Sequence, residues 1–167
     1  RPVVVGFGPA GMFAGLILAE AGLRPIVLER GKDIQRRQQD VNAFWQQHIL
    51  NEESNVQFGE GGAGTFSDGK LTTRIGDALC ETVLETLAAH GAPADIVKKA
   101  KPHVGTDILK DVVREMRREI VKNGGEVHFR TEVTKILEEN GRVTGVMTAD
   151  GAVVETDHVI LSVGHSA

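Results

Sequence analysis

An α/β fold with a parallel sheet and crossover helices is predicted by three observations. The apolar run Val3-Val4-Val5 is typical of a buried strand, and it ends at a glycine-rich turn. A helix rich in small residues follows, and a second apolar strand over 25–28 completes the strand-helix-strand order of a parallel sheet. The last third of the chain alternates short strands with turn signals, which indicates a β-meander.

The turn after the first strand has the glycine spacing of a phosphate-binding loop. The first glycine permits a tight turn, the second lets backbone N–H groups approach a phosphate, and the next helix directs its N-terminus at the negative charge. A turn that merely saves space is the alternative, but it would not explain the strand-helix-strand context. The residues predicted to bind a dinucleotide pyrophosphate are Gly6, Gly8, Pro9, Ala10 and Gly11.

An acidic residue ends the second strand. Glu29 lies about 20 residues after the glycines, where such domains place the carboxylate that binds ribose hydroxyls. A carboxylate accepts hydrogen bonds from free hydroxyls and repels a 2′-phosphate, which favours FAD or NAD over NADP. Arg30 follows at once, and it could accept a phosphate or flank the adenine as a solvated cation. These features together predict a Rossmann-like dinucleotide-binding domain.

The middle of the chain is predicted to be an insertion of loop and helices over 51–105. Before it, a helix over 32–48 begins near Asp33 and has an apolar face that assigns Trp45 to the core. A glycine-rich loop over 51–76 precedes helices over 77–90 and 93–100, and the single cysteine, Cys80, falls on an apolar stripe that predicts a buried thiol.

A longer amphipathic helix leads out of the insertion. Thr106 is predicted to cap it, and Gly124-Gly125 to end it. The side chains on its predicted buried face are Ile108, Leu109, Val112, Val113, Met116 and Ile120.

The segment 126–158 is predicted to be one strand followed by a β-meander. Asn140-Gly141 and Asp150-Gly151 mark its tight turns. The run 159–163 then has the pattern of a buried strand and stops within a few residues. Because the chain also enters its first strand without an initiator methionine, we expect 1–167 to be a truncated part of an FAD/NAD(P)-binding domain.

Composition restricts the classes of partner. The chain has 167 residues, of which 41% are hydrophobic and 25% charged, as expected of one globular domain. A net charge of −4 with scattered cations offers no field for nucleic acid, and no stretch approaches a membrane span or signal peptide. No metal-ligand spacing or hydrolase elbow occurs. We therefore expect a cytoplasmic protein without a metal, nucleic-acid or membrane partner.

The loop over 59–70 contains more glycines than one turn requires. Such a loop can present successive backbone N–H groups to an anion or a flat ring, and its length favours a ligand role over a flexible surface loop. Its candidate cofactor-binding residues are Gly62, Gly64 and Thr65, and Lys70 is a candidate for proton transfer at the flavin or substrate.

Three segments carry a family resemblance. Residues 55–71 (NVQFGEGGAGTFSDGKL), 101–107 and 163–167 resemble a bacterial family of uncharacterised FAD-dependent dehydrogenases with the FAD-binding fold of glutathione reductase. The resemblance implies that the backbone of Val133 binds adenine and that Gly164 lies near the FAD diphosphate, with His165 as a second catalytic candidate. The Gly-Asp motif that holds the flavin ribitol in such proteins is absent here, so the cofactor site is expected to be incomplete.

These observations predict the FAD-binding portion of a flavin-dependent oxidoreductase. Its expected partners are a small-molecule substrate or electron donor, with NAD(P)H as a candidate donor, and the remainder of the parent chain. A flavin-dependent tRNA-modifying enzyme shares the fold but would need a basic surface. A sensor that binds FAD or NAD without turnover is the other alternative, because a fold alone does not define an activity.

Overall fold

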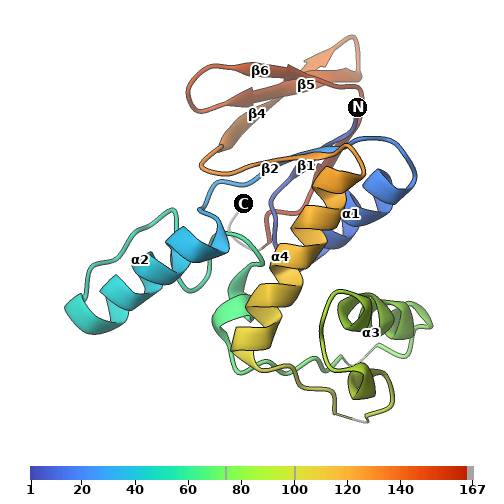
Figure 1. The fold of residues 1–167 in the computed structure, drawn as a ribbon. Helices are drawn as coiled ribbons and strands as arrows, with labels where there is room; N and C mark the ends of the chain where they lie inside the picture. Colours follow the sequence, from blue (N-terminus) through green and yellow to red (C-terminus); the bar gives the residue numbers. More distant parts are fainter. Residues whose placement is uncertain (74, 100, 165–167) are drawn as a thin grey trace.

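A parallel sheet forms the middle of three layers in this computed structural model, which describes residues 1–73, 75–99 and 101–164 (Figure 1). The strands follow the spatial order β3-β2-β1-β7 and all pair in parallel. Their bounds are β1, Val3–Val5; β2, Ile26–Leu28; β3, Glu126–His128; and β7, Val159–Leu161. The side chains of β1 are buried on both faces of the sheet, as expected of a parallel strand covered on each side.

Two helices cover one face of this sheet. α1 (Pro9–Glu20) and α4 (Thr106–Lys122) pack against each other and against the strands (Figure 1). The helix backbone comes close because Gly15 faces the core: a Cβ there would lie 3.2 Å from the side chains of Ile120 and Val27. The buried face of α4 follows the helical period through Leu109, Val112, Val113, Met116 and Ile120.

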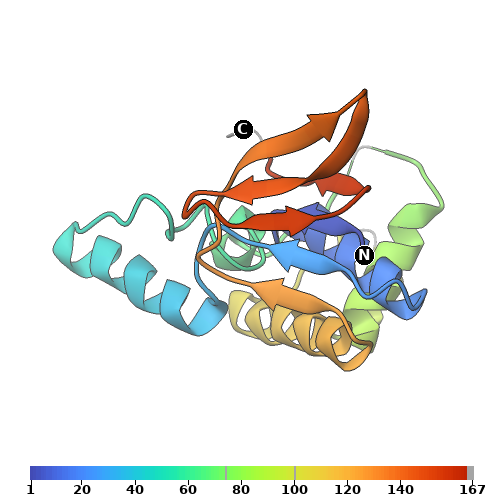
Figure 2. The same ribbon diagram turned by 90° about the horizontal axis from the view of Figure 1, so that it is seen from above.

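An antiparallel meander covers the opposite face. It has the order β4-β5-β6, with β4 at Val133–Glu139, β5 at Arg142–Thr148 and β6 at Val153–Glu155 (Figure 2). Asn140 and Gly141, at φ 52° and 76°, form the turn between β4 and β5, in the left-handed conformations that such hairpins require. A second, smaller core of Val3, Val5, Leu28 and Val146 lies between the two sheets. The predicted α/β architecture with a meander is therefore confirmed.

α2 (Ile34–Gln47) projects from the body of the molecule (Figure 2). Asp33 caps it by accepting the N–H groups of Gln35 and Arg36. Only the first half of the helix is covered, and its buried residues end at Val41. Trp45 is 56% exposed, so its assignment to the core was wrong.

Four other expectations of local structure are corrected. In place of the helix expected over 93–100, of which residue 100 lies outside the described residues, the chain forms a short 3-10 helix, Ala94–Val97, after Pro93. Thr106 is the first residue of α4 and makes no cap, since Gly105 occupies the cap position. Ile108 is 40% exposed beside that helix start, and Cys80 is only partly buried, because α3 (Leu79–Ala89) buries little beyond its last turn.

The last strand also differs from its expected burial. β7 pairs with β1 on one side, and among the described residues no strand pairs with its other side. Ile160 and Leu161 are therefore 37% and 57% exposed rather than buried. The remaining short element is the 3-10 helix Ala63–Phe66 in the glycine-rich loop. No helix in the described part of the chain is long and apolar enough to cross a membrane.

Candidate dinucleotide-binding site

The turn between β1 and α1 can be built only with glycine at two positions. Gly6 has φ +95°, and a Cβ on it would lie 2.5 Å from the carbonyl oxygen of Ser162. A Cβ on Gly11 would fall on the carbonyl oxygen of Gly6, far inside van der Waals contact. The turn is further fixed by the N–H of Gly6, which donates to Leu28 O at 2.8 Å. The backbone is thus packed against the end of β7 with no room for side chains.

The N-terminus of α1 is open to an anion. Gly8 is the N-cap in an extended conformation, Pro9 begins the helix, and no side chain caps the first turn. No acidic residue lies in that turn. A 12-residue helix therefore presents first-turn N–H groups and the positive end of its dipole beside the glycine turn. The structure brings Gly6, Gly8, Pro9, Ala10 and Gly11 together here, as their prediction as pyrophosphate ligands requires.

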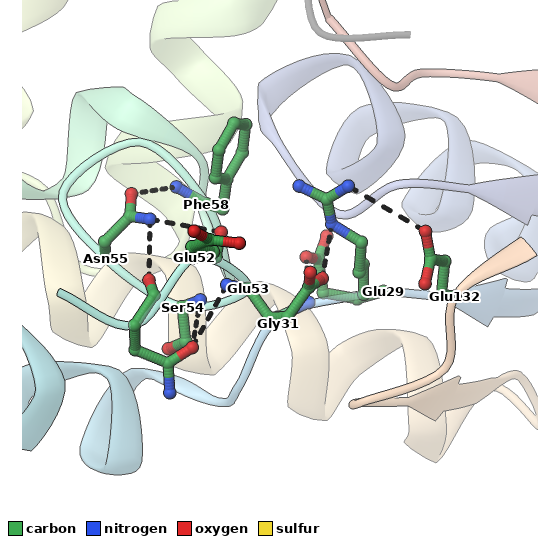
Figure 3. A network of polar contacts seen from close by, with 10 residues as sticks. Glu29, Gly31, Glu52, Glu53, Ser54, Asn55, Phe58 and Glu132 are labelled. Atoms are coloured by element: carbon green, nitrogen blue, oxygen red, sulfur yellow. Dashed lines mark hydrogen bonds and ion pairs between the residues drawn. The ribbon is translucent and has the colours of Figure 1, made fainter. Parts of the chain in front are cut away.

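Glu29 lies directly beside this turn. The residue is buried, with 7% of its surface exposed. One carboxylate oxygen accepts the N–H of Phe7 at 2.7 Å. The other accepts the N–H of Gly31 at 2.7 Å, and Figure 3 shows Glu29 and Gly31. Each carboxylate oxygen can accept a further hydrogen bond. The carboxylate is therefore oriented by the backbone and can still accept bonds from ribose hydroxyls.

Arg30 is held between two carboxylates from different segments. Its guanidinium lies 2.7 Å from Glu53 and 3.9 Å from Glu132, both of which are labelled in Figure 3. The same group lies 4.9 Å from the ring centre of Phe58. Because these carboxylates already neutralise its charge, a 2′-phosphate would have to displace Glu53 to reach Arg30. This favours the prediction that Arg30 flanks the adenine over the prediction that it accepts a phosphate.

An open cleft of about 390 Å³ adjoins this ion pair. Thr131 and Glu132 line it from the connection before β4, and Thr148 lines it from β5. Val133 begins β4 and pairs with Thr148. Arg30 therefore lines the cleft, and the predicted adenine ligand Val133 follows the lining residue Glu132 in the chain.

The glycine-rich loop packs against the back of the phosphate turn. The N–H of Gly61 donates to Phe7 O at 2.8 Å. Gly62 has φ +67°, and a Cβ on it would lie 3.0 Å from Pro9 and 3.2 Å from Gly8. Gly64 faces open space, whereas Thr65 is 1% exposed and its hydroxyl has no hydrogen-bond partner among the residues that the structure describes. Gly62 thus lies at the cradle, and Thr65 lies in the packing behind it, where its hydroxyl could reach a ligand only after the loop shifts.

The two candidates for proton transfer are Lys70 and His165. Lys70 is exposed and forms an ion pair with Asp68 at 2.7 Å. That hydrogen bond raises the pKa of Lys70, so the ammonium stays protonated at neutral pH. Gly164, at φ +71°, lies two residues beyond the Ser162 carbonyl that contacts the turn. His165 lies outside the described residues.

Two buried charged residues near the cradle were not found by sequence reasoning. Arg37 and Glu60 are both 0% exposed. Burial lowers the pKa of Arg37 to about 10 and raises the pKa of Glu60. Glu60 accepts the N–H of Ile34 at 2.7 Å, and its other oxygen lies 3.2 Å from Arg117 Nε. The only signal in the sequence for this burial was the position of Glu60, which lies between two glycines and outside any predicted helix.

Comparisons with known proteins identify similar sequences and a shared fold. Residues 109–167 match the DAO family, described as FAD dependent oxidoreductase. An uncharacterized protein of Clostridium beijerinckii is 53% identical over the whole chain, which spans 31% of that protein. The structure of THI4 from Thermovibrio ammonificans aligns with a TM-score of 0.60 at 18% identity, covering 99% of this chain and 58% of that one.

Glycine oxidase from Bacillus cereus aligns with a TM-score of 0.58 at 16% identity, covering 95% of this chain and 55% of that one. At such identities these two likenesses show the fold alone. The predicted fold class, a Rossmann-like FAD-binding domain with parallel sheet and meander, is thereby confirmed. The narrower resemblance to one bacterial dehydrogenase family stays a prediction.

Proposed function

We propose that this chain is the FAD-binding part of a flavin-dependent oxidoreductase. The observation that carries the proposal is the connection between the uncapped start of α1 and Glu29. An anion-binding helix terminus and a ribose-type carboxylate are joined by one hydrogen bond from Phe7. The match of residues 109–167 to FAD dependent oxidoreductases supports the choice of FAD over NAD.

The residues present fit this cofactor. The glycine turn brings bare backbone to the start of α1, and the first turn of α1 supplies N–H donors for the two phosphates. Glu29 accepts hydrogen bonds from the adenosine ribose, and the cleft lined by Arg30 and Glu132, next to Val133, takes the adenine. Gly62 approaches closely enough to line the diphosphate without a side chain. The flavin, when bound, supplies hydride or electron transfer.

The donor, the substrate and the remainder of the longer protein belong to the same proposal. A nicotinamide nucleotide is the proposed electron donor, and a small molecule the substrate. Lys70, protonated and paired with Asp68, fits the binding of an anionic group better than proton abstraction. His165 stays a candidate by its position after Gly164. A cytoplasmic location is likewise part of the proposal.

The two alternatives gain no support from the comparisons or the fold. A tRNA-modifying enzyme would need a cationic surface, and the chain carries a net charge of −4. A sensor without turnover would not be expected to match an oxidoreductase family.

The first experiment is to purify the full-length parent protein, record its visible spectrum and identify the nucleotide released on denaturation by chromatography. We expect a flavin spectrum, release of FAD and bleaching on addition of NADH or NADPH. A colourless protein that takes up NAD but no added FAD would overturn the proposal.

A further inference from the structure

The side chain of Arg37 is buried although it never reaches the candidate site. We propose that Arg37 is a positioning residue for the cofactor, because its guanidinium fixes the loop that supports both the phosphate turn and Glu29. This inference rests on the proposed binding of FAD, and its test is designed to separate the two.

The guanidinium is bound almost entirely by backbone carbonyls of one loop. Its Nε donates to Asn55 O at 2.8 Å, Nη2 to Val56 O at 3.0 Å, and Nη1 to Glu60 O at 2.6 Å. Nη1 also lies 3.4 Å from Gly59 O. One side chain of α2 thus binds four backbone carbonyls along the chain from 55 to 60.

That path places the loop against the phosphate turn. Directly after the carbonyl of Glu60, the N–H of Gly61 donates to Phe7 O. Gly62 then packs on Gly8 and Pro9, at distances where an added Cβ would be 3.2 and 3.0 Å away. The contact surface of the phosphate turn is therefore only one or two residues from the carbonyls that Arg37 holds.

The same loop supports the ribose side of the site. Gly31, whose N–H binds Glu29, faces Gly59 so closely that a Cβ on Gly31 would lie 2.5 Å from the Cα of Gly59. A Cβ on Gly59 would in turn lie 2.6 Å from Cδ of Arg37. Arg37, Gly59 and Gly31 therefore form one packed chain of contacts that ends at the Glu29 carboxylate.

The arrangement depends on the shape of arginine. A planar guanidinium has five donors in a fixed fork, whereas an ammonium is a point charge that does not match carbonyls spread around it. The ring of Phe66 lies 4.7 Å from the guanidinium carbon and supports its face. Burying this cation is costly unless its donors are bonded, and here the loop supplies those bonds. Even with its lowered pKa of about 10, Arg37 is protonated at neutral pH.

The test compares Arg37→Lys with Arg36→Lys in the full-length protein. Arg36 is the exposed neighbour on the same helix and serves as the matched control. FAD is removed, and its rebinding is followed by flavin fluorescence at a temperature where circular dichroism shows each variant to be folded. We expect Arg37→Lys to weaken FAD binding about tenfold, as loss of a supporting contact typically does, while Arg36→Lys leaves it unchanged.

A double-mutant cycle separates positioning from general destabilisation. Gly62→Ala perturbs the loop where it meets Pro9. If Arg37 acts through this loop, the effects of Arg37→Lys and Gly62→Ala on the FAD dissociation constant are non-additive, because the second change disturbs a contact already displaced. Additive effects, or a lower melting temperature with an unchanged dissociation constant, would overturn the proposal.

If Arg37→Lys does not fold, a milder variant can test the same inference. Phe66→Leu removes the ring under the guanidinium while leaving its donors in place, and it should weaken FAD binding by a smaller factor. Unchanged affinity in that variant would contradict the inference. Absence of FAD binding in the unmodified protein would instead contradict the proposed function, so the two failures are distinguishable.

Discussion

The carboxylate of Glu29 accepts the backbone N–H of Phe7 at 2.7 Å, which joins the end of β2 to the middle of the glycine turn. The parallel pairing of β1 with β2 explains why Glu29 and Phe7 lie side by side. Val5 pairs with Leu28, so the residues that follow the two strands emerge at the same edge of the sheet. The second bond, from Gly31, holds the other carboxylate oxygen. Glu29 and the glycine turn therefore form a single structural unit.

Glu29→Gln should weaken FAD binding and lower stability together. The glutamine amide has one acceptor where the carboxylate has two, so its NH₂ group would face the N–H of either Phe7 or Gly31. We expect a loss of about 1 to 3 kcal/mol in the free energy of unfolding, and at least tenfold weaker FAD binding in a fluorescence titration. Glu20→Gln, on the exposed end of α1, is the control. Unaltered FAD affinity would show that the carboxylate does not bind the ribose.

Gly11→Ala should destabilise the fold itself. The new methyl group would overlap the carbonyl oxygen of Gly6, and neither backbone can move without separating α1 from the turn. We expect a loss of about 3 kcal/mol in chemical denaturation, at the upper end for overpacked positions. Gly76→Ala is the control, because Gly76 lies outside every helix and strand, its φ is not positive and a Cβ there meets no atom within 4 Å. Equal stabilities of the two variants would mean that the turn is not packed as described.

Sequence reasoning succeeded where the signal is local. The glycine spacing, the strand before it and Glu29 lie within thirty residues, and each follows from the conformation or charge that its own position requires. The turn at Asn140-Gly141 was found for the same reason, since both residues adopt positive φ.

The missed features depend on contacts between distant segments. Arg37 and Glu60 look like ordinary surface charges in sequence, and only the path of the aperiodic loop over 51–66 buries them. Trp45 is the opposite case, because it was predicted to be buried and is exposed in the structure. The period of a helix locates its apolar face but does not reveal whether another segment covers that face, and in the described structure the outer part of α2 is uncovered.

Glu60 should give the protein a stability component that falls as pH rises. Burial raises its pKa in the folded state above the ordinary value of 4.5, although the nearby charge of Arg117 opposes the shift. Between the two values the folded state holds a proton that the unfolded state has released, so stability decreases with increasing pH by up to about 1.4 kcal/mol per unit. Below the ordinary value both states are protonated and the component is fully present.

The measurement is the free energy of unfolding against pH for the unmodified protein and Glu60→Gln. Subtracting the two curves removes the contributions of other carboxylates, such as Glu126, whose lowered pKa acts in the opposite direction. We expect the difference to change from about pH 4.5 upward and then level off once Glu60 is ionised in both states. A flat difference would show that Glu60 titrates equally in both states and is not effectively desolvated.

Val41→Ala should reduce the free energy of unfolding more than Trp45→Ala does, although valine has the smaller side chain. Val41 is 0% exposed, and losing two methyl groups there should reduce the free energy of unfolding by about 2 kcal/mol. Trp45, one turn further along α2, is 56% exposed, and its loss should change stability by less than about 0.5 kcal/mol. Chemical denaturation followed by circular dichroism measures both, because the chain's single tryptophan fluorophore is absent from one variant. A larger cost for Trp45→Ala would mean that the outer part of α2 packs against a surface in solution, since only burial of the indole could supply that much free energy.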